Sequence, residues 1–281
     1  MDKEIIESIQ NFIETKRNED ELLTLFPNAL LRTDTIDLLD HFCTIIYYPL
    51  EDRNNGFNID LPSRKNGVIS FVYINTNQTI DKQIFTAAHE LGHIWQIDKE
   101  LIKKGILNSD INPETIMNRF AAELLMPEKH FEKTARSEFM RRTGGQHTIG
   151  IGDLIESVAF LMNLYYTPPV SVVLRLAECN IISQTDADKI VKYIGNEDSP
   201  ISHQLQEVLK DNNFVQFLNP DKKKWIKGLP ELFEKASQDP AISPQKIATL
   251  RAAFDLPDKE HIHDIQKFEE IGTISIEERQ S

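Results

Sequence analysis

The stretch that decides the fold is FTAAHELGHIW, residues 85–95, in which His89 and His93 stand four residues apart. On a helix this spacing is close to one turn, so both imidazole rings project from one face toward a common point. Zinc accepts imidazole nitrogen at about 2.0 to 2.1 Å, and a catalytic zinc site combines three protein ligands with an open position. Glu90 is placed to take a proton from water at such a site. The pattern therefore predicts His89 and His93 as metal ligands and Glu90 as general base.

Two strand-like segments come before this helix. Residues 44–48 (TIIYY) and 68–74 (VISFVYI) are rich in β-branched and aromatic residues, and the turn-forming Asn54-Asn55-Gly56 lies between them. Thr79 or Asp81 is expected to cap the helix that follows. We expect the strand at residues 68–74 to lie along the cleft and to offer a free edge to an extended peptide.

A second helix is the natural source of the third metal ligand. It is expected to begin at Asn112-Pro113, where a capping side chain precedes a proline at the first helical position, and to end before Pro127. It carries two glutamates, Glu114 and Glu123. Nine residues correspond to about 900° of helical rotation, so the two carboxylates face opposite sides. Only one of them can be the ligand.

Glu114 is the better candidate because its face also carries Asn118 and the small Ala121, which permits close packing of two helices. We therefore predict Glu114 as the third ligand and Asn118 as the hydrogen-bonding partner of a ligand histidine. The alternative for Glu114 is a first-turn carboxylate that the helix dipole favours. Asn118 alone would fit an ordinary polar position equally well.

Composition narrows the class of protein. The chain has 281 residues, 40% of them hydrophobic, and a formal net charge of -13, which disfavours non-specific binding to nucleic acid. Its start is acidic and amphipathic, and no stretch reaches the roughly 18 apolar residues of a membrane span. The two cysteines do not form a disulfide framework. We expect a soluble, cytoplasmic protein that binds no membrane.

The length favours a catalytic domain with smaller companions. Residues 1–31 are expected to form an N-terminal helical extension, with Ile5, Ile9, Phe12 and Ile13 at helical spacing and a break near Phe26-Pro27. Residues 32–183 are predicted as the zinc metallopeptidase domain. Residues 184–281 are predicted as a mostly helical region, to which the sequence assigns no role.

The chain resembles the ImmA/IrrE family of metallopeptidases. The stretches that carry the resemblance are VYIN (72–75), FTAAHELGH (85–93), ETIMNRFAAELLMP (114–127) and, more weakly, VSVVLRLAECNII (170–182). The resemblance implies an α+β, zincin-like core of a small sheet and active-site helices. It also implies a gluzincin-like site with zinc on His89, His93 and Glu114, Glu90 as general base and Asn118 at the family's polar position. One departure is Met117, where relatives often carry alanine.

The resemblance further implies a substrate, because such proteins typically cleave a helix-turn-helix repressor and thereby relieve repression in mobile elements, phage or stress responses. A basic DNA-binding partner would suit the acidic chain. Two alternatives stay open. The protein could hold zinc structurally and act as a binding or toxin-antitoxin partner that sequesters a regulator, or it could hydrolyse a non-peptide bond.

Overall fold

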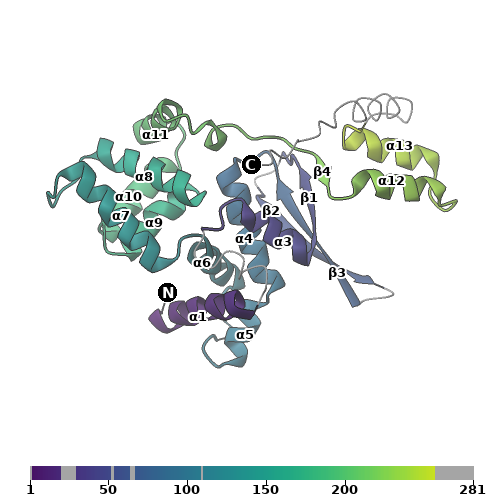
Figure 1. Ribbon diagram of the computed structural model, residues 1–281, viewed down its shortest axis with the longest axis horizontal. Helices are drawn as coiled ribbons and strands as arrows, with labels where there is room; N and C mark the ends of the chain where they lie inside the picture. Colours follow the sequence, from purple (N-terminus) through teal and green to yellow (C-terminus); the bar gives the residue numbers. More distant parts are fainter. Residues whose placement is uncertain (1, 20–29, 52–53, 64–66, 109, 257–281) are drawn as a thin grey trace, which may run out of the picture. The chain divides into compact units, whose positions relative to one another are not determined.

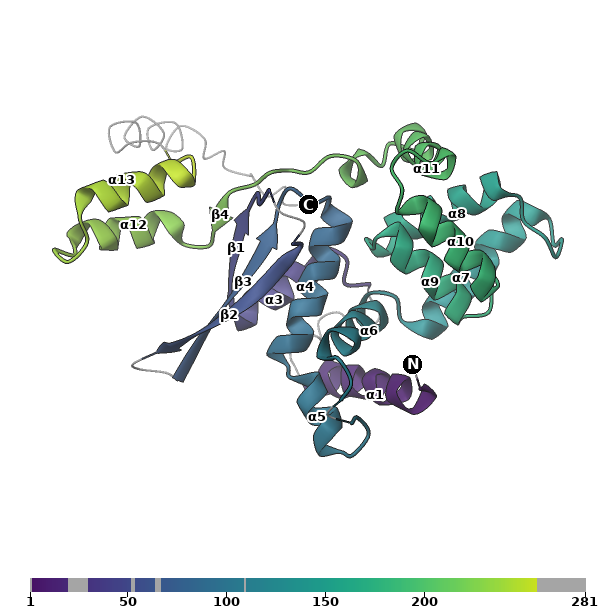
Figure 2. The same cartoon turned by 180° about the vertical axis from the view of Figure 1, so that it is seen from behind.

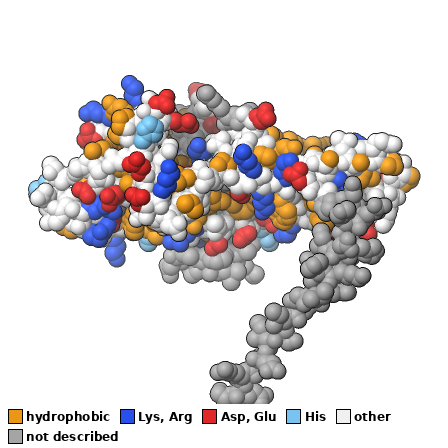
Figure 3. Space-filling view, turned by 90° about the horizontal axis from the view of Figure 1, so that it is seen from above, with side chains coloured by type: hydrophobic (Ala, Val, Ile, Leu, Met, Phe, Trp, Pro, Cys, Tyr) orange, Lys and Arg blue, Asp and Glu red, His pale blue; other side chains and the backbone are white. Residues whose placement is uncertain are grey.

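The computed structural model describes residues 2–19, 30–51, 54–63, 67–108 and 110–256 (Figure 1). They fall into two compact units, Met1–Lys223 and Lys224–Ser281. The first unit combines a small sheet with many helices, so the predicted α+β class is confirmed. On the face drawn in Figure 3, acidic, basic and apolar side chains are interspersed.

The sheet of the first unit contains β1 (Thr44–Tyr48), β2 (Gly56–Ser63) and β3 (Gly67–Asn75) in the order β2-β3-β1. β3 pairs with β1 in parallel and with β2 in antiparallel register. The expectation of a free edge on the strand at residues 68–74 is therefore wrong, because β3 has a partner on both sides. β2 was not predicted as a strand, since Asn58, Asp60 and Pro62 have low β propensity.

Helices cover one face of this sheet. The side chains of Ile45, Tyr47, Val72 and Ile74 alternate along β1 and β3 and are buried, as expected for the face that packs against helices. Helices α3 (Asp34–Phe42) and α4 (Ile80–Ile94) lie on it (Figure 2). The apolar side chains that alternate along β1 and β3 thus form the surface on which α4 packs.

Beyond α4 the chain forms α5 (Ile97–Lys103) and α6 (Pro113–Leu125), and the N-terminal α1 (Lys3–Glu19) packs against both. The periodic residues Ile5, Ile9, Phe12 and Ile13 of α1 are buried in the main core. The predicted break near Phe26-Pro27 lies outside the described residues. α4 is therefore surrounded by the sheet, α3 and α6, and α1 packs against α6.

The remaining helices of the first unit are α7 (Glu128–Thr143), α8 (Ile151–Tyr165), α9 (Pro169–Glu178), α10 (Gln184–Ile194) and α11 (Pro200–Asp211), followed by the short η1 (Val215–Phe217). They share one hydrophobic core with α1 and α3–α6. The predicted boundaries at residues 31/32 and 183/184 fall inside this unit and stay predictions. Among the described residues no single helix is long and apolar enough to span a membrane; α8 and α9 meet that test only jointly, across a bend of 104°.

The second unit begins with β4 (Trp225–Ile226) and contains α12 (Leu229–Gln238) and α13 (Pro244–Ala253). Leu229, Phe233 and Ile247 form its small core. An ion pair of 2.8 Å joins Lys224 to Asp255. The described part of this unit is helical, in line with the pattern expected for residues 184–281.

Candidate metal centre

α4 holds the two histidines in place because its other face is fully apolar. Ile84, Ala88 and Leu91 are completely buried, whereas the side chains of His89 and His93 keep 14% and 27% of their exposure. The helix follows Thr79, whose extended backbone precedes the first helical residue, so Thr79 and not Asp81 occupies the capping position. The apolar stripe thereby fixes which way the imidazoles point.

α6 begins as the sequence predicts. The side-chain oxygen of Asn112 accepts a hydrogen bond of 3.1 Å from the backbone N–H of Glu114, and Pro113 occupies the first helical position. Glu114 therefore lies in the first turn of α6, and its side chain is 58% exposed. This local cap orients the start of the helix toward α4.

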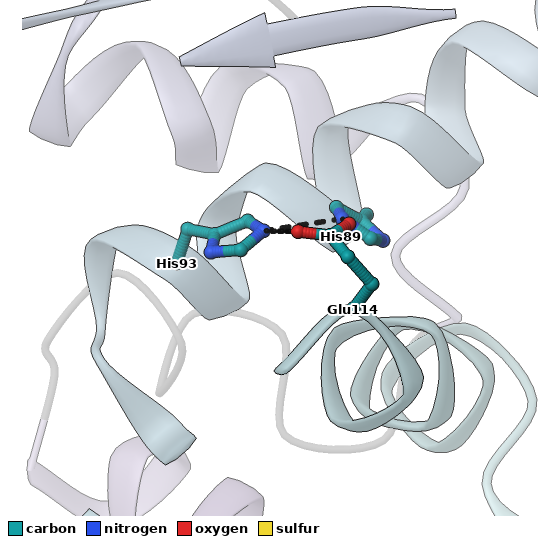
Figure 4. A group of neighbouring side chains, drawn as sticks. All are labelled: His89, His93 and Glu114. Atoms are coloured by element: carbon teal, nitrogen blue, oxygen red, sulfur yellow. Dashed lines mark hydrogen bonds and ion pairs between the residues drawn. The ribbon is translucent and has the colours of Figure 1, made fainter. Parts of the chain in front are cut away.

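The three predicted ligands converge (Figure 4). His89 Nε2 lies 3.0 Å from Glu114 Oε2, and His93 Nε2 lies 3.4 Å from Glu114 Oε1. The two Nε2 atoms are 3.2 Å apart. One ligand atom from each residue lies within 4.8 Å of the others, which is close enough for a single ion to bridge them. Two imidazole nitrogens and one carboxylate oxygen are a donor set that zinc accepts.

Asn118 lies where the sequence argument expects it, one turn after Glu114. Its side-chain oxygen is 3.0 Å from His89 Nδ1, so Nδ1 carries the proton and donates, which leaves Nε2 with a free lone pair. Burial lowers the pKa of His89, although the hydrogen bond with Asn118 acts in the opposite direction. A neutral imidazole with a free Nε2 is the form that binds a metal ion.

Glu90 faces the same cavity as the two histidines. The cavity has a volume of about 570 Å³, and Glu90 is only 5% exposed within its wall. Burial and the nearby charge of Glu114 raise the pKa of Glu90 to about 7. A carboxyl group with a pKa in this range exchanges protons readily near neutral pH, as a general base must.

Residues 41–139 match the family model described as the IrrE N-terminal-like domain, Peptidase_M78. This stretch belongs to that family. The resemblance to the ImmA/IrrE metallopeptidases is thus confirmed over this stretch, and it indicates a metallopeptidase-type function. The match covers β1–β3, α4, α5, α6 and most of α7. A comparison of the chain with curated proteins found no match.

Within this IrrE N-terminal-like domain, Glu123 takes no part in the candidate metal centre. Its carboxylate is 3% exposed and is bound by Arg175 at 2.7 and 2.9 Å and by Arg119. Arg175 was not predicted as a functional residue, because it lies 52 residues from Glu123 in the sequence. The sequence signal that could have identified Arg175 is its position as the one charged residue of the mainly apolar segment VSVVLRL, residues 170–176.

Gly92 brings α4 and α6 close together. A Cβ atom at Gly92 would lie 2.9 Å from both Met117 Sδ and Phe120 Cδ1. Met117 is therefore packed directly against Gly92 and is completely buried. Its side chain fills the space that the missing side chain at Gly92 leaves, so α6 still approaches α4 closely.

Proposed function

We propose that the chain is a zinc-dependent metalloendopeptidase in which His89, His93 and Glu114 hold the ion. The observation that carries the proposal is the convergence of two imidazoles and a carboxylate from α4 and α6 in a family of metallopeptidases. Zinc, when bound, polarises the scissile carbonyl and the attacking water. Glu90 accepts the proton of that water and delivers it to the leaving amine.

The side chains around the three ligands support this assignment. Asn118 fixes the tautomer of His89 through its contact with Nδ1, and burial keeps that imidazole neutral. The cavity is also lined by Asn54 and Asn55, which precede β2, and by Asn58 within β2. These amides are suited to hydrogen bonding with peptide groups of a substrate.

The substrate chain is proposed to lie along β2 and not along β3. Among the residues that the structure describes, β2 pairs with β3 alone, and its residues Gly56, Phe57 and Asn58 line the cavity. An extended peptide that adds to this edge would gain main-chain hydrogen bonds with little demand on its side chains. Selectivity would then depend on contacts outside the cavity.

A helix-turn-helix repressor remains the proposed substrate, with the proteolysis serving transcriptional regulation in a cytoplasmic setting. The resemblance in sequence supports it, and so does the net charge of -13, which would attract a basic DNA-binding protein. Because acidic and basic side chains are mixed on the face in Figure 3, we expect a diffuse attraction that weakens with salt. A complex insensitive to salt would count against this partner.

The test separates metal binding from catalysis. Glu90→Gln should retain zinc and lose cleavage by at least about a hundredfold, since general acid–base catalysis typically contributes this much. Glu100→Gln on α5 is the matched control and should cleave normally, because this half-buried carboxylate pairs with Lys104 and does not line the cavity. The assay offers the purified protein a helix-turn-helix regulator from the same genome, and mass spectrometry identifies its fragments. Undiminished cleavage by Glu90→Gln would remove Glu90 from the mechanism, whereas binding without any cut would favour sequestration.

A further inference from the structure

The C-terminal end of α6 is held by a buried network of charges. Glu123 accepts hydrogen bonds from Arg175 of α9, from Arg119 of α6 and, at 3.1 Å, from Gln10 of α1. Glu178 of α9 pairs with both arginines, at 3.0 Å in the case of Arg175. The network joins two arginines to two glutamates, so its charges balance.

Arg175 occupies the centre of this network. Its side chain is 1% exposed, and its guanidinium binds both carboxylate oxygens of Glu123. The same group donates to the carbonyl oxygen of Met126, at 3.2 Å from Nε and 3.0 Å from Nη2. Met126 is the residue at which α6 ends, so Arg175 satisfies a carbonyl that the helix leaves without a partner.

A network of this kind sets geometry more than it adds stability. Removal of charges from water offsets most of their mutual attraction, and apolar residues of similar size often stabilise a core equally well. The planar guanidinium, in contrast, fixes the direction and separation of the groups that it binds. The bonds of Arg175 to Glu123 and Met126 therefore oppose rotation and sliding of α6.

Rotation of α6 would displace Glu114. The Cα atoms of a helix lie about 2.3 Å from its axis, so a rotation of about 25° moves each by about 1 Å. Metal–ligand distances tolerate only about ±0.2 Å. The close contact of Gly92 with Met117 and Phe120 fixes the middle of α6 against α4, and Arg175 fixes its far end.

We propose that Arg175 is a positioning residue for Glu114: it clamps the end of α6 through Glu123 and Met126 and so holds Glu114 against the two histidines. The inference rests on the proposed metal site. Arg175, Glu178 and Gln10 all lie outside residues 41–139, so α1 and α9 complete a site that the family domain alone does not fix.

The test uses the full chain and the double variant Glu123→Met with Arg175→Met. This variant removes one charge of each sign, leaves Arg119 paired with Glu178 and leaves Gln10 its contact with Glu128. The matched control is Glu132→Met with Arg136→Met on α7, since Arg136 also binds a glutamate and a backbone carbonyl, that of Cys179. If the first double variant does not fold, Arg175→Lys replaces it, because lysine keeps the charge without the planar fork.

Zinc affinity is measured by competition with a chelator, and amide exchange along α6 is measured in the metal-free protein. We expect zinc to bind about tenfold more weakly to the clamp variant, with faster exchange along α6, and normally to the control. A zinc Kd within about threefold of the wild-type value in the folded clamp variant would overturn the proposal. If the wild-type protein binds no zinc, the proposed function fails. Equal amide exchange along α6 in the wild-type protein and the clamp variant would overturn the clamp independently of zinc.

Discussion

The side-chain oxygen of Asn118 lies 3.0 Å from Nδ1 of His89. This contact fixes the tautomer of His89, and the substitution Asn118→Ala removes the contact. We expect zinc to bind about 10 to 100 times more weakly to this variant, the usual effect of losing such a partner. Chelator competition gives the affinity. Asn163→Ala on α8 is the control, because its side-chain oxygen accepts a hydrogen bond from Gln216 and neither residue lines the cavity. Equal affinity in both variants would mean that Asn118 does not support the site.

Glutamine in place of each glutamate of α6 should change stability to very different extents. Glu114→Gln is expected to abolish tight metal binding with little change in the free energy of unfolding, because the side chain is 58% exposed. Glu123→Gln is expected to lower the free energy of unfolding by about 3 kcal/mol or more, since it leaves buried arginine charge uncompensated. Urea unfolding and metal analysis of both variants decide the matter. Equal losses of stability in the two variants would contradict this division of roles.

Gly56 should be intolerant of a side chain. A Cβ atom there would overlap the carbonyl oxygen of Tyr73 and lie 2.5 Å from Thr86 Cγ2, so β2 would have to move away from β3 and α4. We expect Gly56→Ala to cost about 1 to 3 kcal/mol of stability and to raise KM for a peptide. Gly152→Ala is the control, because its new Cβ would meet only Gln204 Nε2 at 3.4 Å within a helix. Thermal unfolding that is unchanged in Gly56→Ala would refute the packing argument.

The stability contributed by Glu138 should depend on pH. Burial alone would raise its pKa, but hydrogen bonds from Arg141 and Arg142 outweigh burial and lower it. Because the pKa of Glu138 is lower in the folded state than in the unfolded state, its ionised form stabilises the protein fully above about pH 4.3. This stabilisation is lost as the pH falls through the folded-state pKa. Glu138→Gln should therefore lower the free energy of unfolding at pH 7 by about 0.5 to 1 kcal/mol after allowance for solvent screening. The difference from wild type should shrink in acid.

Denaturant unfolding at neutral and acidic pH checks this prediction. Glu132→Gln serves as the control, because Glu132 forms an exposed ion pair with a single arginine, Arg136, among the described residues. Arg142 also contacts Glu156, which is exposed and keeps part of the network after the substitution. A Glu138→Gln defect that grows as the pH falls would have the wrong sign for this explanation.

The features that were predicted correctly are those determined by residues close together in the sequence. The start of α6 follows from Asn112 and Pro113, and the histidine pair follows from helical spacing. β2 escaped prediction because its residues have low strand propensity, and only pairing with β3 makes it a strand. The contact of Arg175 with Glu123 joins residues far apart in the chain, so no local pattern could reveal it. The wrong assignment of a free edge to β3 followed directly from the missing strand.

The measurement that tests the account most directly is the metal content of the purified full chain, determined by elemental analysis after equilibration with zinc and removal of unbound metal. We predict one zinc ion per chain and its loss in His93→Ala, because His93 Nε2 lies within 3.4 Å of both other candidate ligands. A folded wild-type protein that takes up neither zinc nor another divalent ion would contradict the assignment of His89, His93 and Glu114 as a metal centre.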